Sequence, residues 1–276
     1  MLIDSHTHLD HCQDDAATLV ADAQSAGVEL IIQSGIDLQR SRESVAMAER
    51  FPQVFATVGF HPQEAGLLDD QGRAALEELV RHPRVVGVGE TGFDFFHDNW
   101  PHDVQEDTFV YHLDLARRAG LPVVIHTRDA AERTLAVLAE HAAGLTVILH
   151  CFSLPDRLEE IATRGYYISF AGNVTYKNAP ALQEAAVAAP ADRLLLETDA
   201  PWLTPVPLRG RPNRPALVAA VYDFVAALRG VHRDELAAQV EANVMRAFPR
   251  IAAARGGAGP GGAARAAAAP SQGTSA

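Results

Sequence analysis

Residues 122–150 read PVVIHTRDAAERTLAVLAEHAAGLTVILH, in which two short apolar runs stand on either side of a longer segment with helical spacing. The runs Pro122–His126 and Thr146–His150 have the length and the β-branched composition of strands, and Ala130–Ala142 is typical of a helix. Because both runs are almost continuously hydrophobic, they fit parallel strands that are buried on both faces. This stretch therefore predicts a strand–helix–strand unit.

The same unit repeats along most of the chain. Six further apolar runs indicate strands: Met1–His6, Val28–Ser34, Val54–Gly59, Val85–Glu90, Tyr166–Phe170 and Arg193–Thr198. Segments of helical spacing lie between and after the runs: Asp14–Ala26, Leu38–Arg50, Gln71–His82, His102–Ala119, Pro155–Arg164, Asn178–Ala188, Arg214–Leu228 and Arg233–Phe248. Strand–helix repeats over about 250 residues favour an α/β fold, a single (β/α)8 barrel of the TIM type. Because the rhythm does not show closure, a doubly wound open sheet is the alternative.

Composition places the chain among soluble globular proteins, since 48% of its 276 residues are apolar and 21% are charged. We assign residues 1–254 to one domain and expect residues 255–276, which are rich in Ala, Gly and Pro, to form a disordered tail. A signal peptide and a long apolar span are not evident, and the two cysteines fit a reducing compartment. We therefore expect a cytoplasmic protein without a membrane partner; its oligomeric state does not follow from the sequence.

The formal net charge limits the partners of the protein. Twenty-three basic and thirty-five acidic residues give a charge of −12, so the surface as a whole should repel polyanions. Any contact with a nucleic acid must therefore depend on a local site.

Metal-binding residue types stand at the ends of the predicted strands, where catalytic and ligand groups gather in both candidate folds. Two histidines at i and i+2 on a strand point to the same face, and imidazoles with carboxylates are typical ligands of zinc and other transition metals. A single strand-end histidine is more often a hydrogen-bonded structural residue, but a set at five strand ends favours a metal site. We predict two divalent cations: His6, His8 and Asp199 hold one, His126 and His150 hold the second, and Glu90 bridges them.

Seven stretches occur in order along the chain: Asp4–Asp10 (DSHTHLD), Gly59–Pro62 (GFHP), Gly87–Asp94 (GVGETGFD), Leu121–Ala130 (LPVVIHTRDA), His150–Ser153 (HCFS), Leu196–Pro201 (LETDAP) and Arg209–Asn213 (RGRPN). With these motifs the chain resembles the TatD family of metal-dependent deoxyribonucleases, an amidohydrolase-like branch of barrel hydrolases, from Met1 to about Phe248. The resemblance implies 3′ to 5′ exonuclease action on DNA. Leu154, Arg214 and the phenylalanines Phe93, Phe95 and Phe96 depart from the usual family pattern, which bears on substrate choice rather than on hydrolysis.

The predicted ligand set suits hydrolysis of a phosphodiester. Two cations about 3.5 to 4 Å apart can bind the phosphate oxygens, lower the pKa of a shared water and stabilise the leaving oxygen. We expect Asp199 to act as the general base, with His61 as the second choice and Glu90 as the bridging catalytic ligand. Asp4 and Glu197 share strand parity with His6 and Asp199, so we expect their carboxylates to orient the ligating histidines. The alternative for Glu197 is a structural ion pair.

Arginine and lysine side chains near the same rim should bind substrate phosphates, because guanidinium groups bind phosphate in a bidentate manner. The candidates are Arg128, Lys177, Arg209, Arg211 and Arg214, and the alternative for all of them except Arg128 is that they are solvated loop residues. With the net negative surface, such a site suits a short single-stranded segment or a strand end.

Other functions remain open at this stage. The same metal centre could hydrolyse another ester or an amide, as a D-aminoacyl-tRNA deacylase or a lactonase does, because barrels use one centre for many reactions. A non-catalytic binding protein is a further alternative, which the complete ligand set disfavours. Histidine ligands favour Zn or Mn, whereas the family resemblance implies Mg, so the metal is undecided among these ions.

Overall fold

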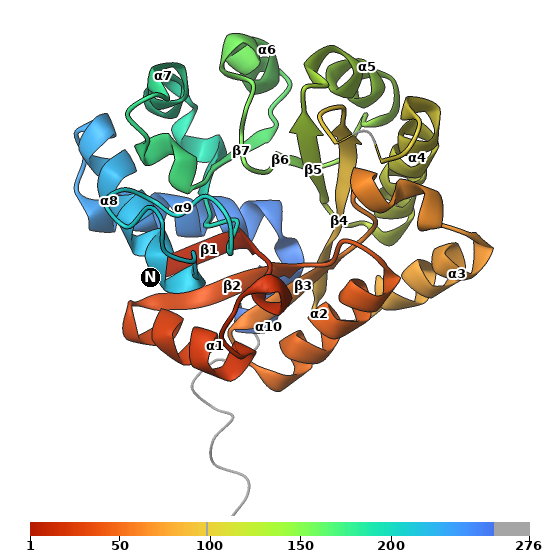
Figure 1. Cartoon of the computed structure of the whole chain (residues 1–276), viewed down its shortest axis with the longest axis horizontal. Helices are drawn as coiled ribbons and strands as arrows, with labels where there is room; N and C mark the ends of the chain where they lie inside the picture. Colours follow the sequence, from red (N-terminus) through yellow and green to blue (C-terminus); the bar gives the residue numbers. More distant parts are fainter. Residues whose placement is uncertain (98, 257–276) are drawn as a thin grey trace, which may run out of the picture.

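The computed structural model describes residues 1–97 and 99–256. Eight parallel strands pair in chain order into one sheet, which curls into a nearly closed barrel with helices around it (Figure 1). The strands are β1 (Leu2–Thr7), β2 (Val28–Ser34), β3 (Val54–Val58), β4 (Val85–Asp94), β5 (Val123–Arg128), β6 (Val147–Leu149), β7 (Tyr167–Phe170) and β8 (Leu194–Leu196). Nearly every strand residue is buried, as the continuous apolar runs predicted, and the (β/α)8 barrel is confirmed.

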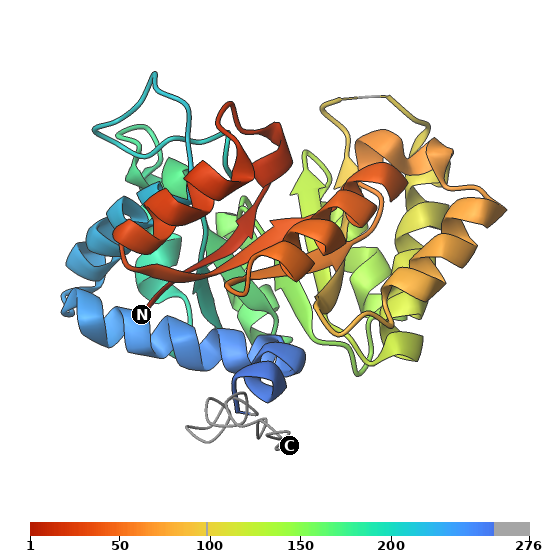
Figure 2. The same ribbon diagram turned by 90° about the horizontal axis from the view of Figure 1, so that it is seen from below.

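Helices follow the strands and pack around the barrel. Their bounds are α1 (Ala16–Ser25), α2 (Leu38–Arg50), α3 (Asp70–Leu79), α4 (His102–Ala119), α5 (Ala131–His141), α6 (Leu158–Thr163), α7 (Pro180–Ala188), α8 (Val218–Arg229), α9 (Arg233–Ala247) and α10 (Pro249–Gly256). The first three begin at aspartates, Asp15, Asp37 and Asp69, whose carboxylates accept hydrogen bonds from N–H groups of the first turn. Figure 2 shows α9 and α10 at the lower end of the barrel, opposite the long loops.

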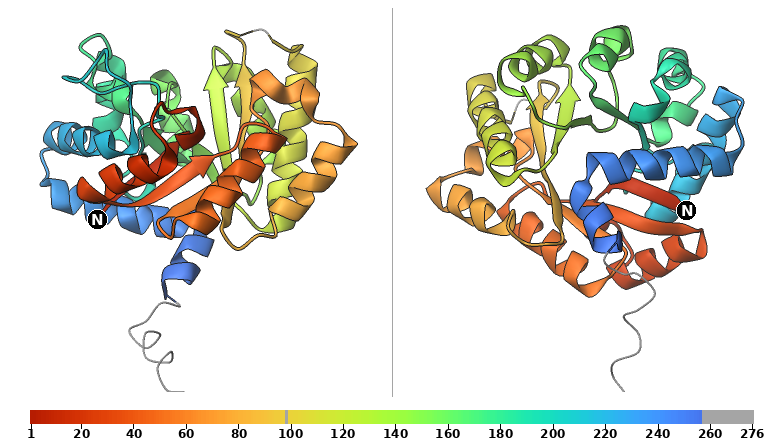
Figure 3. Two further views of the ribbon diagram at one scale, coloured as in Figure 1. Left: turned by 60° about the horizontal axis from the view of Figure 1, so that its bottom comes forward. Right: turned by 180° about the vertical axis from the view of Figure 1, so that it is seen from behind.

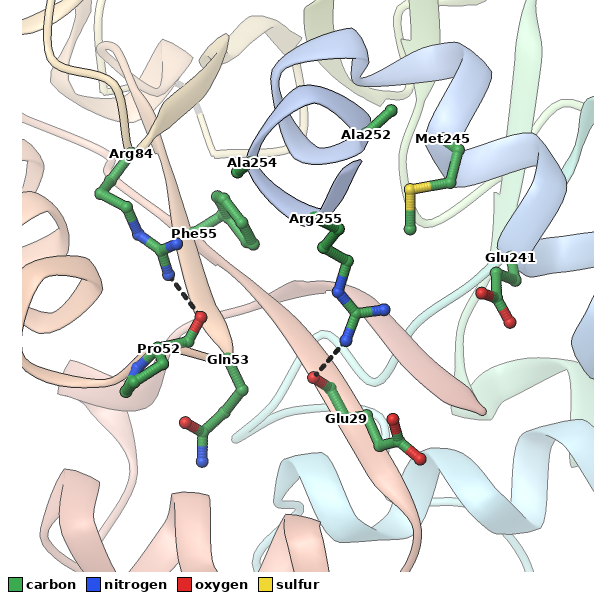
Figure 4. Close-up of a pocket in the computed structure, with 10 residues that line it drawn as sticks. All are labelled: Glu29, Pro52, Gln53, Phe55, Arg84, Glu241, Met245, Ala252, Ala254 and Arg255. Carbon is green, nitrogen blue, oxygen red and sulfur yellow. Dashed lines mark hydrogen bonds between the residues drawn. The ribbon is translucent and has the colours of Figure 1, made fainter. Parts of the chain in front are cut away.

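Helix α10 lies where the sequence analysis placed no element, and Arg255 and Gly256, assigned to the tail, are helical. Its position depends on tertiary contacts: Ile251 is fully buried, and Arg250 donates to the carbonyl oxygens of Val80 and Val85. Figure 4 shows Arg255 at a hollow beneath α10, donating to the carbonyl of Glu29 at 3.4 Å. The other residues of the expected tail lie outside the described residues.

Hydrogen bonds from both backbone and side chains join the two ends of the sheet. The segment after β8 meets β1 through two backbone hydrogen bonds, from the Asp199 N–H to the His6 carbonyl (3.0 Å) and from the His8 N–H to the Ala200 carbonyl (2.8 Å). Asp4 contributes to this seam, because its carboxylate accepts from the backbone N–H (2.8 Å) and the hydroxyl (2.7 Å) of Thr198. We expected Asp4 to orient a histidine; instead its hydrogen bonds connect the strand ends.

Tyr222 of α8 completes the seam from outside the barrel. Its buried hydroxyl accepts from the Ile3 N–H at 3.2 Å and donates to the Ile3 carbonyl at 3.1 Å. One hydroxyl therefore pairs both backbone groups of a residue that has no ladder partner in β8.

Substituting phenylalanine for Tyr222 should destabilise the fold, because it leaves two buried backbone groups unpaired. We expect Tyr222→Phe to lower the free energy of unfolding by about 2 to 3 kcal/mol in urea denaturation. Tyr111→Phe is the matched control: its hydroxyl donates to the Arg73 carbonyl at 3.0 Å in a partly exposed place, so we expect a loss below about 1 kcal/mol. Equal losses in the two variants would contradict this role for Tyr222.

By length and hydropathy, none of the helices within the described ranges qualifies alone as a membrane span. One bent pair, Pro215–Arg229 with Arg233–Ala247, meets the criteria only when its two parts are taken together, across a bend of 107°.

Candidate metal centre

All six predicted ligands meet at the carboxyl ends of the strands, with Glu90 of β4 between two groups of histidines. One oxygen of Glu90, Oε1, lies 2.8 Å from His150 Nε2 and 2.9 Å from His126 Nδ1. The other oxygen, Oε2, lies 3.2 Å from His6 Nε2 and 3.4 Å from His8 Nε2. One oxygen of Glu90 thus faces His126 and His150 and the other faces His6 and His8, while the rings of His6 and His150 stack with 3.9 Å between their centroids.

A β-bulge directs Glu90 toward the centre. Val88 of β4 pairs with Val123 of β5, but Thr91 pairs with Ile125, so three steps along β4 match two along β5. Such an extra residue bends a strand and redirects its side chains, and bulges are frequent beside active sites. The Glu90 N–H donates to the carbonyl of Gly35 (3.1 Å), and the side chain is almost completely buried.

Asp199 reaches the first pair of histidines from the loop after β8. Its Oδ1 lies 3.6 Å from His8 Nε2 and 3.9 Å from His6 Nε2. The backbone of Asp199 adopts φ = 52°, a left-handed conformation that is uncommon for residues other than glycine and is often found at functional sites. Its side chain is 14% exposed, against 3% for Glu90, so Asp199 is the carboxylate of the two that reaches the solvent. Burial raises the pKa of Asp199 to about 6.

Polar groups lie against the outer nitrogens of His6 and His150. His6 Nδ1 lies 3.0 Å from the Ser34 hydroxyl, and His150 Nδ1 lies 3.4 Å from Glu197 Oε1. An outer acceptor keeps the proton on the outer nitrogen, so that the lone pair of the inner nitrogen faces the centre. Glu197 Oε1 also accepts a hydrogen bond from the Cys151 N–H at 2.7 Å, which holds this carboxylate beside His150.

Asp94 has the corresponding place behind His126, with its Oδ2 3.5 Å from His126 Nε2. Asp94 is not among the site residues predicted from the sequence. The feature of the sequence that points to a role is its position, four residues after Glu90 in the same motif. The carboxylate is held by the backbone N–H groups of Phe96 (3.1 Å) and His97 (2.9 Å) and by the side chain of Gln63 (2.9 Å).

The donor set fits divalent cations. The inner nitrogens of His6 and His8 are 3.1 Å apart, and those of His126 and His150 are 3.3 Å apart. Two lone pairs at this separation repel each other unless a proton or a cation lies between them, and metal ligation requires neutral imidazoles and ionised carboxylates. Burial, together with His150, lowers the pKa of His6 to about 4, which favours its neutral form.

The carboxylates also require positive charge at the centre. Although burial favours the protonated acid, His150 and a hydrogen bond from His126 hold the pKa of Glu90 well below its usual range. Against the effect of burial, Glu90 in turn raises the pKa of His8 and His150. Protons on these two rings, or cations in their place, can therefore balance the acid groups, and cation binding should release protons.

His61, the second choice for the base, lies beside Glu90 with its Nε2 at 3.4 Å from Oε1. Its Nδ1 accepts a hydrogen bond from the Gln63 N–H at 3.1 Å, so the neutral ring carries its proton on Nε2. Burial and the neighbouring His126 lower the pKa of His61 to about 3, which keeps the ring neutral. In this tautomer His61 directs an N–H toward the centre, which makes it a hydrogen-bond donor there.

His112 of α4 holds the strand end that carries His61. Its Nε2 accepts from the Phe60 N–H (2.9 Å), and its Nδ1–H donates to the Thr108 carbonyl (2.7 Å). Both ring nitrogens are used only in the neutral form, and burial lowers the pKa of His112 to about 4. In the unfolded chain the pKa of a histidine is about 6.5. Between about pH 6.5 and pH 4, residue 112 therefore binds a proton in the unfolded chain but not in the folded chain.

The contribution of neutral His112 to the free energy of unfolding is therefore complete above pH 6.5, and it is lost as the pH falls to about 4. We expect this residue to lower the free energy of unfolding by about 2 kcal/mol between pH 7 and pH 5. Urea denaturation of the wild type and of His112→Gln at both pH values measures the effect, and the variant should show the smaller pH dependence. The same pH dependence in both proteins would show that His112 does not contribute.

The centre opens into a cleft of about 1260 Å³, which exceeds the usual size of a small-molecule pocket. Of the five predicted phosphate-binding residues, Arg128 lines this cleft. Arg133 and Arg157 also line it and were missed; they pair with Glu106 and Glu132. Little in the sequence indicates that these two arginines line the cleft, because their positions depend on how α5 and the loop after β6 pack.

The other four predicted phosphate-binding residues are not among those that line the cleft in the described part of the chain. A role of Arg214 in binding phosphate is not supported, because its guanidinium forms two ion pairs. One is with Asp14, just before α1 (3.1 Å), and the other is with Asp22 of α1 (2.9 Å). The guanidinium of Arg209 lies 4.1 Å above the ring of Tyr176. Lys177 and Arg211 likewise lie outside the set that lines the cleft.

The order of these elements and motifs matches a known family. A family model described as TatD related DNase matches residues 3–249. The chain belongs to the TatD family. This confirms the resemblance inferred from the motifs, and it identifies the protein as a metal-dependent hydrolase of the TatD type.

Similar TatD proteins match over almost their whole length. The chain is 40% identical to the "Uncharacterized metal-dependent hydrolase TatD" of Mycobacterium tuberculosis, over 90% of this chain and 97% of that protein. It is 35% identical to the "3'-5' ssDNA/RNA exonuclease TatD" of Cronobacter sakazakii, over 88% and 94%. Among solved structures, the TatD homologue YjjV of Escherichia coli superposes with a TM-score of 0.83 at 30% identity, over 90% of this chain and 98% of that one.

Proposed function

We propose that this TatD-family protein is a nuclease that removes nucleotides from the 3′ ends of single-stranded DNA with two divalent cations. The observation that carries the proposal is the position of Glu90, which directs one oxygen toward each of two histidine pairs at the floor of an open cleft. The exonuclease name of the Cronobacter sakazakii relative supports the choice of substrate.

Each ligand has a defined place in this proposal. His6, His8 and Asp199 would hold one cation, His126 and His150 would hold the other, and Glu90 would contact both. Two divalent cations in these places would polarise the phosphodiester and lower the pKa of a water molecule. Imidazole-rich ligand sets favour Mn or Zn over Mg on ligand softness, so the metals are tested separately below.

The proton of the attacking water would be accepted by the carboxylate of Asp199. Both carboxylates line the cleft, but Asp199 is the more exposed of the two, at 14% against 3% for Glu90, and its Oδ1 faces the first histidine pair. His61 would donate its Nε2–H to an oxygen at the centre, in keeping with its tautomer. Arg128, two residues beyond His126 on the wall of the cleft, would bind a phosphate of the substrate.

The test uses single-stranded DNA labelled at its 5′ end. We expect the metal-reconstituted protein to shorten the DNA stepwise from the 3′ end, and a chelator to stop the reaction. Mg, Mn and Zn are added back separately, and an RNA of the same sequence is compared with the DNA. A reconstituted protein that leaves both nucleic acids intact but hydrolyses a D-aminoacyl-tRNA would overturn the proposal in favour of an esterase.

A further inference from the structure

Two large aromatic side chains are exposed near the metal centre. Trp202 is 49% exposed and lines the cleft, and Phe96 is 58% exposed. Single exposed apolar residues are common on protein surfaces. These two differ because the backbone of each is hydrogen-bonded to a segment that carries a candidate ligand or its neighbour, and because each ring lies against a residue that lines the cleft.

Trp202 stands three residues after Asp199 in the loop that follows β8. Its backbone N–H donates to the Asp199 carbonyl (3.0 Å), and its backbone carbonyl accepts from the side chain of Asn213 (2.5 Å). The indole ring lies 5.3 Å from the ring of His8 and 5.5 Å from that of His11, measured between centroids. The indole is therefore held directly beside a candidate ligand, with about half of its surface open to a substrate.

Phe96 stands two residues after β4, and its N–H donates to the same Asp94 carboxylate that lies behind His126. The guanidinium carbon of Arg128 lies 4.0 Å from the centroid of the Phe96 ring. Arg128 thus joins an aromatic ring to the wall of the cleft and adds a positive charge beside it.

The two rings belong to opposite sides of the barrel mouth, because β4 and β8 are four strands apart in a ring of eight. Figure 2 shows the loop after β4 and the loop after β8 rising on opposite sides of the upper end, and the left view of Figure 3 shows the same separation. A chain that crosses the centre from one loop to the other would contact an aromatic ring on each side and would meet Arg128 on one of them.

We propose that Trp202 and Phe96 are stacking platforms for unpaired nucleobases, with Trp202 holding the base beside the metal centre and Phe96 a base farther along. The inference rests on the proposed function, since it names the feature of the substrate that the site recognises. Aromatic side chains bind bases through the π face that every base has, so recognition tolerates any sequence. Bases inside a duplex are stacked and paired already, so the platforms select a single-stranded end.

The test compares a single-stranded oligothymidylate with an oligonucleotide of the same length whose last residues lack bases. We expect the wild type to prefer the base-containing substrate by about tenfold to a hundredfold in kcat/KM. Trp202→Ala should remove most of this preference, chiefly through a higher KM, and Trp202→Phe should restore it. Phe96→Ala should lower it independently. Val187→Ala, at a similarly exposed apolar residue on α7, should behave as the wild type.

A preference for bases that survives both alanine substitutions would overturn the inference, as would an equal loss on the two substrates. Hydrolysis of neither substrate by the wild type would instead count against the proposed function. Binding then still tests the platforms: fluorescence anisotropy of an oligothymidylate with hydrolysis-resistant phosphorothioate links should show weaker binding in Trp202→Ala. Unchanged binding would overturn the inference on its own.

Discussion

Glu90→Gln is expected to abolish metal-dependent hydrolysis and to empty the metal centre. Both carboxylate oxygens of Glu90 face histidine nitrogens, at 2.8 to 3.4 Å, so this one group serves both halves of the site. An amide removes the negative charge, and its NH2 group would direct hydrogens toward one of the two cation positions. We expect kcat to fall by at least about a thousandfold, because the ligands act as a unit.

Metal content is the second measurement for this variant. After reconstitution, elemental analysis should find two equivalents of metal in the wild type and less than one in Glu90→Gln. Glu140→Gln, the same substitution at a largely exposed position on α5, is the matched control and should retain both activity and metal. A Glu90→Gln protein that keeps both cations and its activity would show that Glu90 is not the bridging ligand.

Gly92→Ala is expected to have the largest effect on stability, because residue 92 of β4 combines an unusual backbone angle with a close contact. Its φ is +137°, and an added methyl group would collide with the carbonyl oxygen of His126 on β5. To avoid the collision, β4 and β5 must separate where they hold Glu90 and His126. We expect a loss of more than about 4 kcal/mol in the free energy of unfolding, or failure to fold, together with weaker metal binding.

Gly144→Ala separates the two causes. Gly144 also has a positive φ, +77°, but an added methyl group would meet no other atom within 4 Å. We therefore expect only the cost of the left-handed backbone, about 1 kcal/mol, and unchanged metal content. Equal losses in urea denaturation would show that backbone strain alone, and not the contact with His126, explains the effect at Gly92.

The position of the metal centre could be predicted from the sequence for a physical reason. Parallel strands in a barrel all end on the same face, so residues that end consecutive apolar runs meet there however far apart they are in the chain. This rule alone predicts that His6, Glu90 and His150 lie together. The same rule does not describe what lies behind them, and for this reason Asp94 was missed and Asp4 was assigned to a histidine rather than to Thr198.

The loops show the opposite situation. Arg214 and Arg128 both looked suited to bind phosphate, but the first pairs with Asp14 and Asp22 and the second lines the cleft. Arg128 stands two residues beyond the predicted ligand His126, whereas Arg214 belongs to a long loop, where the partner of a long flexible side chain depends on which segment packs beside it. Trp202 gave no signal either, since its exposure and its contact with His8 appear only in the folded chain.

The sequence by itself determined the strand–helix repeat and the residues that stand at the strand ends, because hydrophobic periodicity and strand direction are local properties, and its ordered motifs indicated the family. Closure of the sheet into a barrel was decided by the tertiary structure. Tertiary structure alone decided the bulge that directs Glu90 inward, the acceptors behind the histidines, the hydroxyl of Tyr222 at the seam and the two aromatic rings at the mouth. Each of these depends on a contact between segments that are not adjacent in the chain, and such contacts form only when the strands pair and the helices pack.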